Sequence, residues 1–130
     1  MKRVMAQGCF DVIHPGHLHY LEKSADLGDE LVVVVARDSR VGDRKKLAFN
    51  EDERVEILNA LETVDRAVLG SEGDIYSTVK EIDPNVITVG YDQSHETEEV
   101  QKLAEDATEH DVKVKRISGK GDYSSSKIKN

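Results

Sequence analysis

The sequence predicts an α/β fold: a Rossmann-like, doubly wound parallel five-stranded sheet in a single domain. Short apolar runs alternate along the chain with segments whose apolar residues recur at helical spacing, and this alternation is typical of parallel strands joined by helical crossovers. One of the runs, Leu31–Ala36, is almost unbroken valine, as expected of a strand covered on both faces. With 130 residues the chain has the length of one ordinary domain, so 1–130 is assigned to one unit.

The remaining elements follow from spacing and from helix-stopping residues. Leu18, Leu21 and Ala25 give the first helix its apolar spacing, and Pro84 stops the third helix. The last segment alternates apolar and basic residues, which indicates an exposed edge strand. The expected strands are Arg3–Gln7, Leu31–Ala36, Ala67–Leu69, Val86–Val89 and Val112–Ile117, and the expected helices between them are Gly16–Leu27, Glu51–Leu61, Asp74–Ile82 and Glu96–Glu109.

The composition narrows the functional classes. A formal net charge of −8 disfavours binding to nucleic acid, whose phosphates are neutralised by basic side chains. No apolar run approaches the roughly 20 residues that span a bilayer, and the N-terminus lacks the apolar stretch of a signal peptide. We therefore expect a soluble, cytoplasmic protein without a membrane partner. Cys9 is the single cysteine, which excludes an intrachain disulfide and a cysteine-based zinc site.

Doubly wound sheets bind ligands beyond the carboxyl ends of their strands, near the switch point of the topology. This rule singles out the loops Gly8–Gly16, Arg37–Asn50 and Gly90–His95. The second loop carries a basic cluster in an otherwise acidic protein. Such clusters are often solvated surface, but at this end of a sheet phosphate capture is the favoured interpretation. The cluster consists of Arg37, Arg40, Arg44, Lys45 and Lys46.

The first loop places two histidines across a helix start. Pro15 disfavours helix at His14, and Gly16 lets the backbone approach a ligand. Backbone amides at a helix start, with the helix dipole behind them, suit a phosphate group. The imidazoles of His14 and His17 would then face the same anion. Spacing alone leaves open the alternative of two surface histidines in a loop.

A longer pattern surrounds the histidine pair. Gly8-Cys9-Phe10-Asp11 followed by His14-Pro15-Gly16-His17 resembles the signature of the HxGH nucleotidylyltransferase superfamily. Over nearly all its length the chain is similar to the cytidylyltransferase-like group, which includes glycerol-3-phosphate cytidylyltransferase and, with the greater likeness, archaeal-type FAD synthase. The segments that carry this likeness are Val35–Asp38, Lys45-Lys46, Leu69–Ile75, Gly90-Tyr91-Asp92-Gln93 and Ser124-Ser125-Ser126-Lys127-Ile128.

The resemblance implies transfer of AMP from ATP to FMN, with release of pyrophosphate. It also implies a divalent metal, with Mg²⁺ as the expected ion, that arrives on the triphosphate rather than on protein ligands. It implies catalytic roles for His14, His17 and Lys46, and acceptor-binding roles for Asp11, Lys45 and Arg54. It implies nucleotide binding by Gly8, Cys9, Phe10, His14, Pro15, Gly16, His17, Gly90, Asp92, Ser124, Ser125 and Ser126.

The chain departs from the group at two positions. Cys9 stands where the relatives usually carry a small hydroxylic residue, so one side-chain hydrogen bond to phosphate is weakened or lost. Tyr123 stands where an arginine often opens the serine-rich segment, which puts one phosphate contact in doubt. Two residues have open interpretations. Arg54 is either a surface helix residue or a bidentate grip on the acceptor phosphate. Cys9 is either a structural thiol, which is the favoured interpretation, or a nucleophile. No functional role is assigned to His19, His95 and His110. A ligand contact stays open for His95, because it follows Asp92-Gln93 closely.

The sequence excludes two other classes of nucleotide-binding protein and leaves two alternative functions open. The chain lacks the Gly-Lys-Ser/Thr loop of a Walker-type NTPase and the Gly-x-Gly-x-x-Gly of a dinucleotide-binding dehydrogenase. CTP-dependent transfer to glycerol phosphate is the alternative reaction, and a non-catalytic nucleotide-binding module is the alternative without one. By analogy with relatives of this size, we expect a homodimer.

Overall fold

The computed structural model describes residues 2–8, 10, 15–37, 49–70, 75–90 and 97–117. Each expected element is present, with ends within two residues of the prediction. The strands are β1 (Arg3–Gly8), β2 (Glu30–Val35), β3 (Arg66–Leu69), β4 (Val86–Gly90) and β5 (Lys113–Ile117), and the helices are α1 (Pro15–Ala25), α3 (Glu51–Asn59), α4 (Ile75–Ile82) and α5 (Thr97–Thr108). No helix within these ranges is long and apolar enough to cross a membrane.

The five strands form one parallel sheet in the order β3-β2-β1-β4-β5. The chain winds outward from β1 to β3 and then returns to the other side of β1, so the switch point lies between β1 and β4. The predicted doubly wound parallel sheet is confirmed. β1 stays in register with β2 as far as Gly8↔Val35, whereas its register with β4 covers Val4↔Val86 and Met5↔Ile87.

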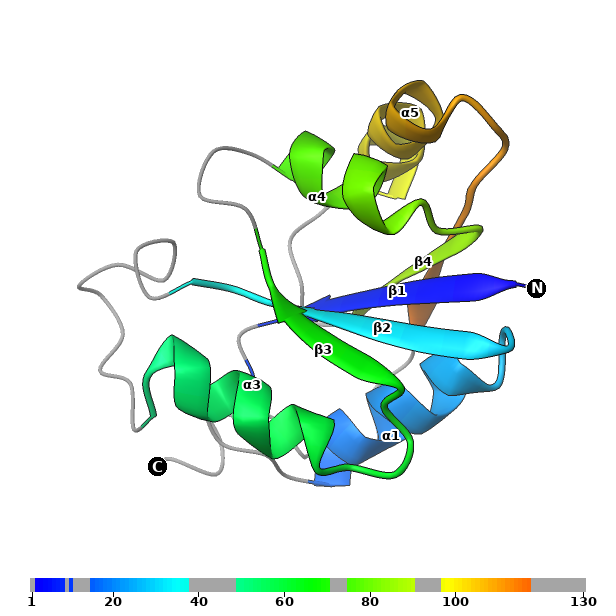
Figure 1. Cartoon of the computed structure of the whole chain (residues 1–130). Coiled ribbons are helices and arrows are strands. Elements are labelled where there is room, and N and C mark those ends of the chain that lie inside the picture. Colours follow the sequence, from blue (N-terminus) through cyan, green and yellow to red (C-terminus); the bar gives the residue numbers. More distant parts are fainter. Residues whose placement is uncertain are drawn as a thin grey trace.

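Helices cover both faces of the sheet. Figure 1 shows α1 and α3 on one face and α4 and α5 on the other. The valine run of β2 serves both layers, because Val33 and Val35 belong to the core cluster under α1 and α3 while Val32 and Val34 belong to the cluster under α4 and α5. Burial of each such side chain contributes about 1.5–3 kcal/mol. The prediction of a strand covered on both faces is therefore confirmed.

The buried face of α1 differs from the prediction. Leu18, which was expected on the apolar face, is 39% exposed, whereas Tyr20, Leu21 and Ser24 are buried. The apolar spacing was misleading because two members of the buried face carry hydroxyl groups. Both hydroxyls are hydrogen-bonded inside the protein, which removes the penalty that would otherwise keep them at the surface.

Helix α3 begins with a capping box. The Asn50 side chain accepts a hydrogen bond from the backbone N–H of Glu53 at 2.8 Å, and the Glu53 carboxylate accepts from the N–H of Asn50 at 3.0 Å. This pair satisfies two of the amides that a helix start leaves without partners. It fixes the first turn of α3 and therefore the direction of the next side chain, Arg54.

Candidate active site at the carboxyl edge of the sheet

The described residues contain part of the predicted site. Gly8 ends β1, Gly90 ends β4, and Pro15, Gly16 and His17 form the first turn of α1. These segments meet at the switch point, because β1 and β4 are neighbours in the sheet. Phe10 and Arg54 are also described. The other predicted site residues lie outside the described residues: Cys9, Asp11, His14, Lys45, Lys46, Asp92, Ser124, Ser125 and Ser126.

The start of α1 suits an anion. Pro15 is its first residue, and its fixed φ favours a helix start without losing a needed N–H. The first turn contains no acidic residue, so the partial positive charge of the helix end is not neutralised there. The first turn of α3 differs, since Glu51, Asp52 and Glu53 occupy it. Of these two helix starts, only that of α1 has the charge to receive a phosphate.

The buried ring of Phe10 packs against the ring of His17. Its φ is 54°, in the left-handed region that bulky residues rarely adopt, and its side chain is 4% exposed. The ring lies edge-to-face with that of His17, at a centroid distance of 5.5 Å and an interplanar angle of 61°. Phe10 was predicted to bind nucleotide, but with its ring buried only its backbone is suited to such a contact.

Gly8 makes room for this arrangement. A Cβ atom at Gly8 would lie 2.9 Å from Cε2 of Phe10, which is too close for the ring to stay where it is. The N–H of Ala36 donates to the Gly8 carbonyl at 2.9 Å, so the end of β1 is also tied to the end of β2. Glycine at the end of β1 is therefore required by packing, in addition to any contact with a ligand.

Arg54 is fully buried, with 0% exposure. The alternative of a surface helix residue is therefore wrong. Arginine is rarely buried unless its charge is compensated, and Arg54 shares its buried helix face with Leu58 four residues later. That i, i+4 spacing was the signal in the sequence. This spacing was not used for the prediction, which left both interpretations of Arg54 open.

Two arginines that flank the site donate to glycine carbonyls at the carboxyl edge. Nη1 of Arg116 donates to the carbonyl of Gly90 at 2.8 Å. Nε of Arg37 donates to the carbonyl of Gly70 at 2.6 Å, and its Nη1 lies 3.4 Å from Oε2 of Glu51. Arg37 was assigned to the phosphate-capturing cluster, and it also has this bridging role. Sequence reasoning did not find Arg116, whose acceptor is 26 residues away.

A polar network lies beneath α1 at the switch point. The Tyr20 hydroxyl donates to the Thr88 carbonyl at 2.8 Å, and the backbone N–H of Gln7 donates to the same hydroxyl at 3.2 Å. The Ser24 hydroxyl donates to the Tyr20 carbonyl at 2.7 Å and lies 2.8 Å from Oγ1 of Thr88. All four residues are buried. The network holds α1 against both strands whose ends frame the site.

Comparison with known proteins assigns the chain to a class. The cytidylyltransferase-like family matches residues 5–130, and the chain belongs to that family. With its parallel sheet and its helix start at the switch point, the protein is a nucleotidyltransferase of the HxGH superfamily. Among the described residues, no group of three or more His, Cys, Asp or Glu side chains is placed to hold a metal ion.

Two of the most similar proteins are both FAD synthases. The chain is 46% identical over 124 residues to the FAD synthase of Methanohalobium evestigatum, covering 95% of this chain and 82% of that protein. It is 53% identical over 102 residues to the FAD synthase of Thermoplasma volcanium, covering 78% and 72%.

Two solved structures are similar. One is the lipopolysaccharide core biosynthesis protein from Thermoplasma volcanium GSS1, with a TM-score of 0.86 and 49% identity, covering 92% of this chain and 98% of that one. The other is a protein of unknown function from Archaeoglobus fulgidus, with a TM-score of 0.72 and 16% identity, covering 90% and 89%. The second likeness concerns the fold alone.

Proposed function

We propose that this protein is an FAD synthase, which transfers AMP from ATP to the phosphate of FMN and releases pyrophosphate. The observation that carries the proposal is the identity of 46% and 53% to proteins called FAD synthase over most of the chain. The helix start at Pro15-Gly16-His17 supports it, because this turn lies at the switch point, where such sheets bind their ligands.

The reaction is an in-line displacement at phosphorus. A phosphate oxygen of FMN forms a bond to the α-phosphorus of ATP, and the bond from that phosphorus to the oxygen bridging to the β-phosphate breaks. Because a phosphate monoester has its second pKa near 6, FMN is mostly ionised at neutral pH and needs little help from a general base. A divalent metal bound to the triphosphate of the ATP substrate would neutralise charge on the leaving pyrophosphate. Catalysis then rests on placement and on charge stabilisation.

Different groups of site residues are proposed to stabilise the reacting phosphates and to bind the rest of the nucleotide. The amides at the start of α1 and the imidazole of His17 face the charge that develops on the α- and β-phosphates, together with His14 and Lys46. The end of β4 at Gly90, with Asp92 and the serines 124–126, holds the rest of the nucleotide. A donor aimed at such developing charge contributes roughly 3 kcal/mol.

Arg54 is proposed to hold the phosphate of the acceptor, with Lys45 and Asp11. Its support is the chemistry of the side chain, since a guanidinium forms charge-assisted hydrogen bonds with phosphate oxygens; the acceptor would have to displace side chains that bury Arg54. The capping box of Asn50 and Glu53 fixes the first turn of α3, and so it gives this side chain a defined direction. A planar guanidinium also matches two phosphate oxygens at once.

Product analysis tests the proposal. Purified protein is mixed with ATP or CTP and with FMN or glycerol 3-phosphate, and products are identified by mass. We expect FAD from FMN plus ATP, with kcat/KM at least about tenfold above glycerol 3-phosphate plus CTP, a difference of about 1.4 kcal/mol in transition-state stabilisation. The reverse ranking would overturn the flavin assignment and leave nucleotidyl transfer standing. No pyrophosphate from any pair would favour a non-catalytic module.

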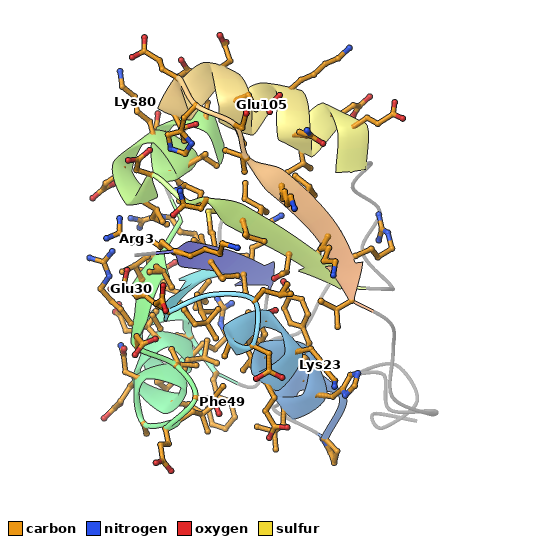
Figure 2. The ribbon with its side chains drawn as sticks, turned by 90° about the vertical axis from the view of Figure 1, so that its right-hand side faces the viewer. Arg3, Lys23, Glu30, Phe49, Lys80 and Glu105 are labelled. Carbon is orange, nitrogen blue, oxygen red and sulfur yellow. The ribbon has the colours of Figure 1, made fainter. Side chains whose placement is uncertain are left out.

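The proposal includes a homodimer. Leu18 and Phe49 are large apolar side chains that are 39% and 37% exposed, and both belong to the layer of α1 and α3. Figure 2 shows Phe49 in that layer, away from the sheet. Apolar side chains at a surface are typical of protein contacts when they gather. Light scattering at micromolar concentration is expected to give twice the 14.5 kDa of one chain, and a mass near 14.5 kDa would contradict it.

A further inference from the structure

The Tyr20 hydroxyl joins β1 and β4 beyond the point where their backbones pair. Past the Met5↔Ile87 pair, the N–H of Gln7 and the carbonyl of Thr88 both bind this phenol, at 3.2 and 2.8 Å. A side chain therefore bridges the two strands where they approach the site. Tyr20 comes from α1, so the bridge also fixes the helix that begins with the active-site turn.

The ring of Tyr20 supports a second ring, which in turn meets His17. Phe10 lies nearly parallel to Tyr20, with centroids 6.4 Å apart and an interplanar angle of 20°. Phe10 also meets the His17 imidazole edge-to-face at 5.5 Å. Both distances are within the range of favourable aromatic pairs. Phe10 therefore contacts both the ring of Tyr20 and the ring of His17.

Imidazole orientation matters for the reaction. The torsion that turns an imidazole ring is broad and does not settle into sharp minima by itself, so an isolated histidine would sample many ring orientations. A donor helps only when it is aimed at the charge that develops in the transition state, and misplacement of about 1 Å lowers rate roughly a hundredfold. His17 is half-buried, so the ring packed against it limits how far it can turn.

We propose that Tyr20 is a positioning residue of the active site, which acts through the ring of Phe10 to set the orientation of the His17 imidazole. The inference rests on the role of His17 in the proposed function. The strained φ of Phe10 supports it, because a bulky residue keeps a left-handed backbone only where the surrounding packing holds it. Tyr20 touches neither substrate in this scheme, so its effect passes through His17.

Three variants separate positioning from stability. Tyr20→Phe keeps the stacked ring and removes the hydroxyl bridge, while Phe10→Leu keeps an apolar side chain and removes the aromatic contact. Ser24→Ala is the matched control, because it deletes a buried hydroxyl of the same network and leaves the bridge between the strands. The ring signals of His17 are recorded by NMR without substrate. Tyr20→Phe and Phe10→Leu should shift them, and Ser24→Ala should leave them in place.

The kinetics provide the second readout. Tyr20→Phe and Phe10→Leu should lower kcat roughly tenfold while KM for ATP changes less than about twofold, since the lost interaction acts in the transition state. In a His17→Ala background, Tyr20→Phe should have no further effect, because residues that act as a unit are not additive. Circular dichroism and thermal melts confirm that each variant is folded.

The outcomes are distinct. If Tyr20→Phe lowers kcat equally with and without His17, its role is structural and the proposal is wrong. If the His17 signals are unmoved in Tyr20→Phe, the proposal is also wrong; Phe10→Leu removes a neighbouring ring and shifts these signals in either case, so it serves as the positive control. If His17→Ala alone keeps wild-type turnover, the role of His17 in the proposed function fails, and the NMR signals still decide whether Tyr20 orients the ring.

Discussion

The amino and carboxyl edges of the sheet, where its parallel strands begin and end, are stabilised by different side chains. At the amino edge, short acidic and amide side chains accept hydrogen bonds from the strand backbones, and Arg3 is neutralised by Glu30 while its Nη1 donates to the Ile82 carbonyl at 2.6 Å. Figure 2 shows Arg3 and Glu30 side by side at this edge. The N–H groups of Lys2, Arg3 and Leu31 donate to side-chain oxygens of Asp29, Asn85 and Asp65, respectively.

The carboxyl edge uses cations and glycines instead. Arg37 and Arg116 donate to the carbonyls of Gly70 and Gly90, and the first turn of α1 itself contains no acidic residue. Acidic groups that satisfy N–H donors stabilise the amino edge. At the carboxyl edge Glu51 faces Arg37, and a carboxylate at the start of α1 would repel a phosphate there. The comparison therefore predicts that stability and activity can be changed separately by substitutions at the two edges.

The largest expected effect is at the carboxyl edge. His17→Ala should lower kcat by roughly a hundredfold, because it removes a donor to the developing charge, about 3 kcal/mol of transition-state stabilisation. Its melting temperature should stay close to wild type, since His17 is only half-buried. Steady-state kinetics with FMN and ATP measure the effect. His19→Ala, two residues further along α1, is the control and should keep wild-type kinetics.

A matched pair of glycines gives the next test. A Cβ at Gly28, near the amino edge, would lie 2.7 Å from the backbone oxygen of Lys2 and 2.7 Å from Cγ2 of Val4. Gly28→Ala should therefore lower the free energy of unfolding by about 1–3 kcal/mol and leave kcat unchanged. Gly8→Ala, at the carboxyl edge, should displace the Phe10 ring and lower kcat roughly tenfold.

Urea unfolding and steady-state kinetics on both glycine variants provide the measurement. We expect Gly28→Ala to lose mainly stability and Gly8→Ala to lose mainly turnover. If Gly28→Ala loses turnover while its folded fraction stays full, the two edges are coupled and the separation fails. The same conclusion would follow if Gly8→Ala kept wild-type turnover.

A smaller effect is expected from Arg3→Met. The substitution keeps the aliphatic stem and removes the ion pair with Glu30 and the hydrogen bond to the carbonyl of Ile82. Because both side chains of the ion pair are about a quarter exposed, solvent screening limits the loss to about 1 kcal/mol. A protein of this size should then melt about 4 °C lower. We expect kcat to be unchanged, and a tenfold loss of kcat would show that the two edges are coupled.

Local patterns predicted the fold well. The valines of β2 indicated a strand covered on both faces, and the alternation in Val112–Ile117 indicated an edge strand; β5 lies at the edge. These patterns depend on periodicity, which the backbone geometry imposes within a few residues. Leu18 was misplaced because periodicity was read from apolar residues alone, and the hydroxyls of Tyr20 and Ser24 are satisfied by distant partners.

The site could be predicted only in part. The turn at Pro15, Gly16 and His17 was predicted because its residues are contiguous, because a helix start favours anions and because the surrounding motif resembles the HxGH signature; the structure places it at the switch point. Tyr20 was missed because its acceptor, the Thr88 carbonyl, is 68 residues away, and no local pattern encodes such a contact. The same reason applies to Arg116. The catalytic and binding roles of the site residues themselves remain predictions that the variants above address.

The smallest expected effect lies at the amino edge and depends on pH. His110 follows α5, and its Nε2 lies 2.8 Å from Oδ1 of Asp83, the residue after α4, while its Nδ1 lies 2.9 Å from the carbonyl of Asp111. The Asp111 carbonyl and then the Asp83 carboxylate raise the pKa of His110 above its usual value of 6.5. With both ring nitrogens facing acceptors, the protonated ring is the form that the fold favours.

The sign of the pH dependence follows from that raised pKa. Folding favours protonated His110, so its contribution to stability is fully present below pH 6.5 and is lost as pH rises through the raised pKa. Asp83→Asn removes the charge and keeps a residue that tolerates the left-handed φ of 55° at this position. The melting temperature of wild type should exceed that of Asp83→Asn at about pH 6, and the difference should shrink by about pH 9.

Because the pair of His110 and Asp83 is exposed at the surface, the change in melting temperature should be smaller than that of Arg3→Met. The kcat should be equal in wild type and Asp83→Asn at each pH, since the active site lies at the other edge of the sheet. A difference in melting temperature that grows with pH would mean that Asp83 stabilises the end of α4 through other contacts, and that His110 does not link α4 to α5.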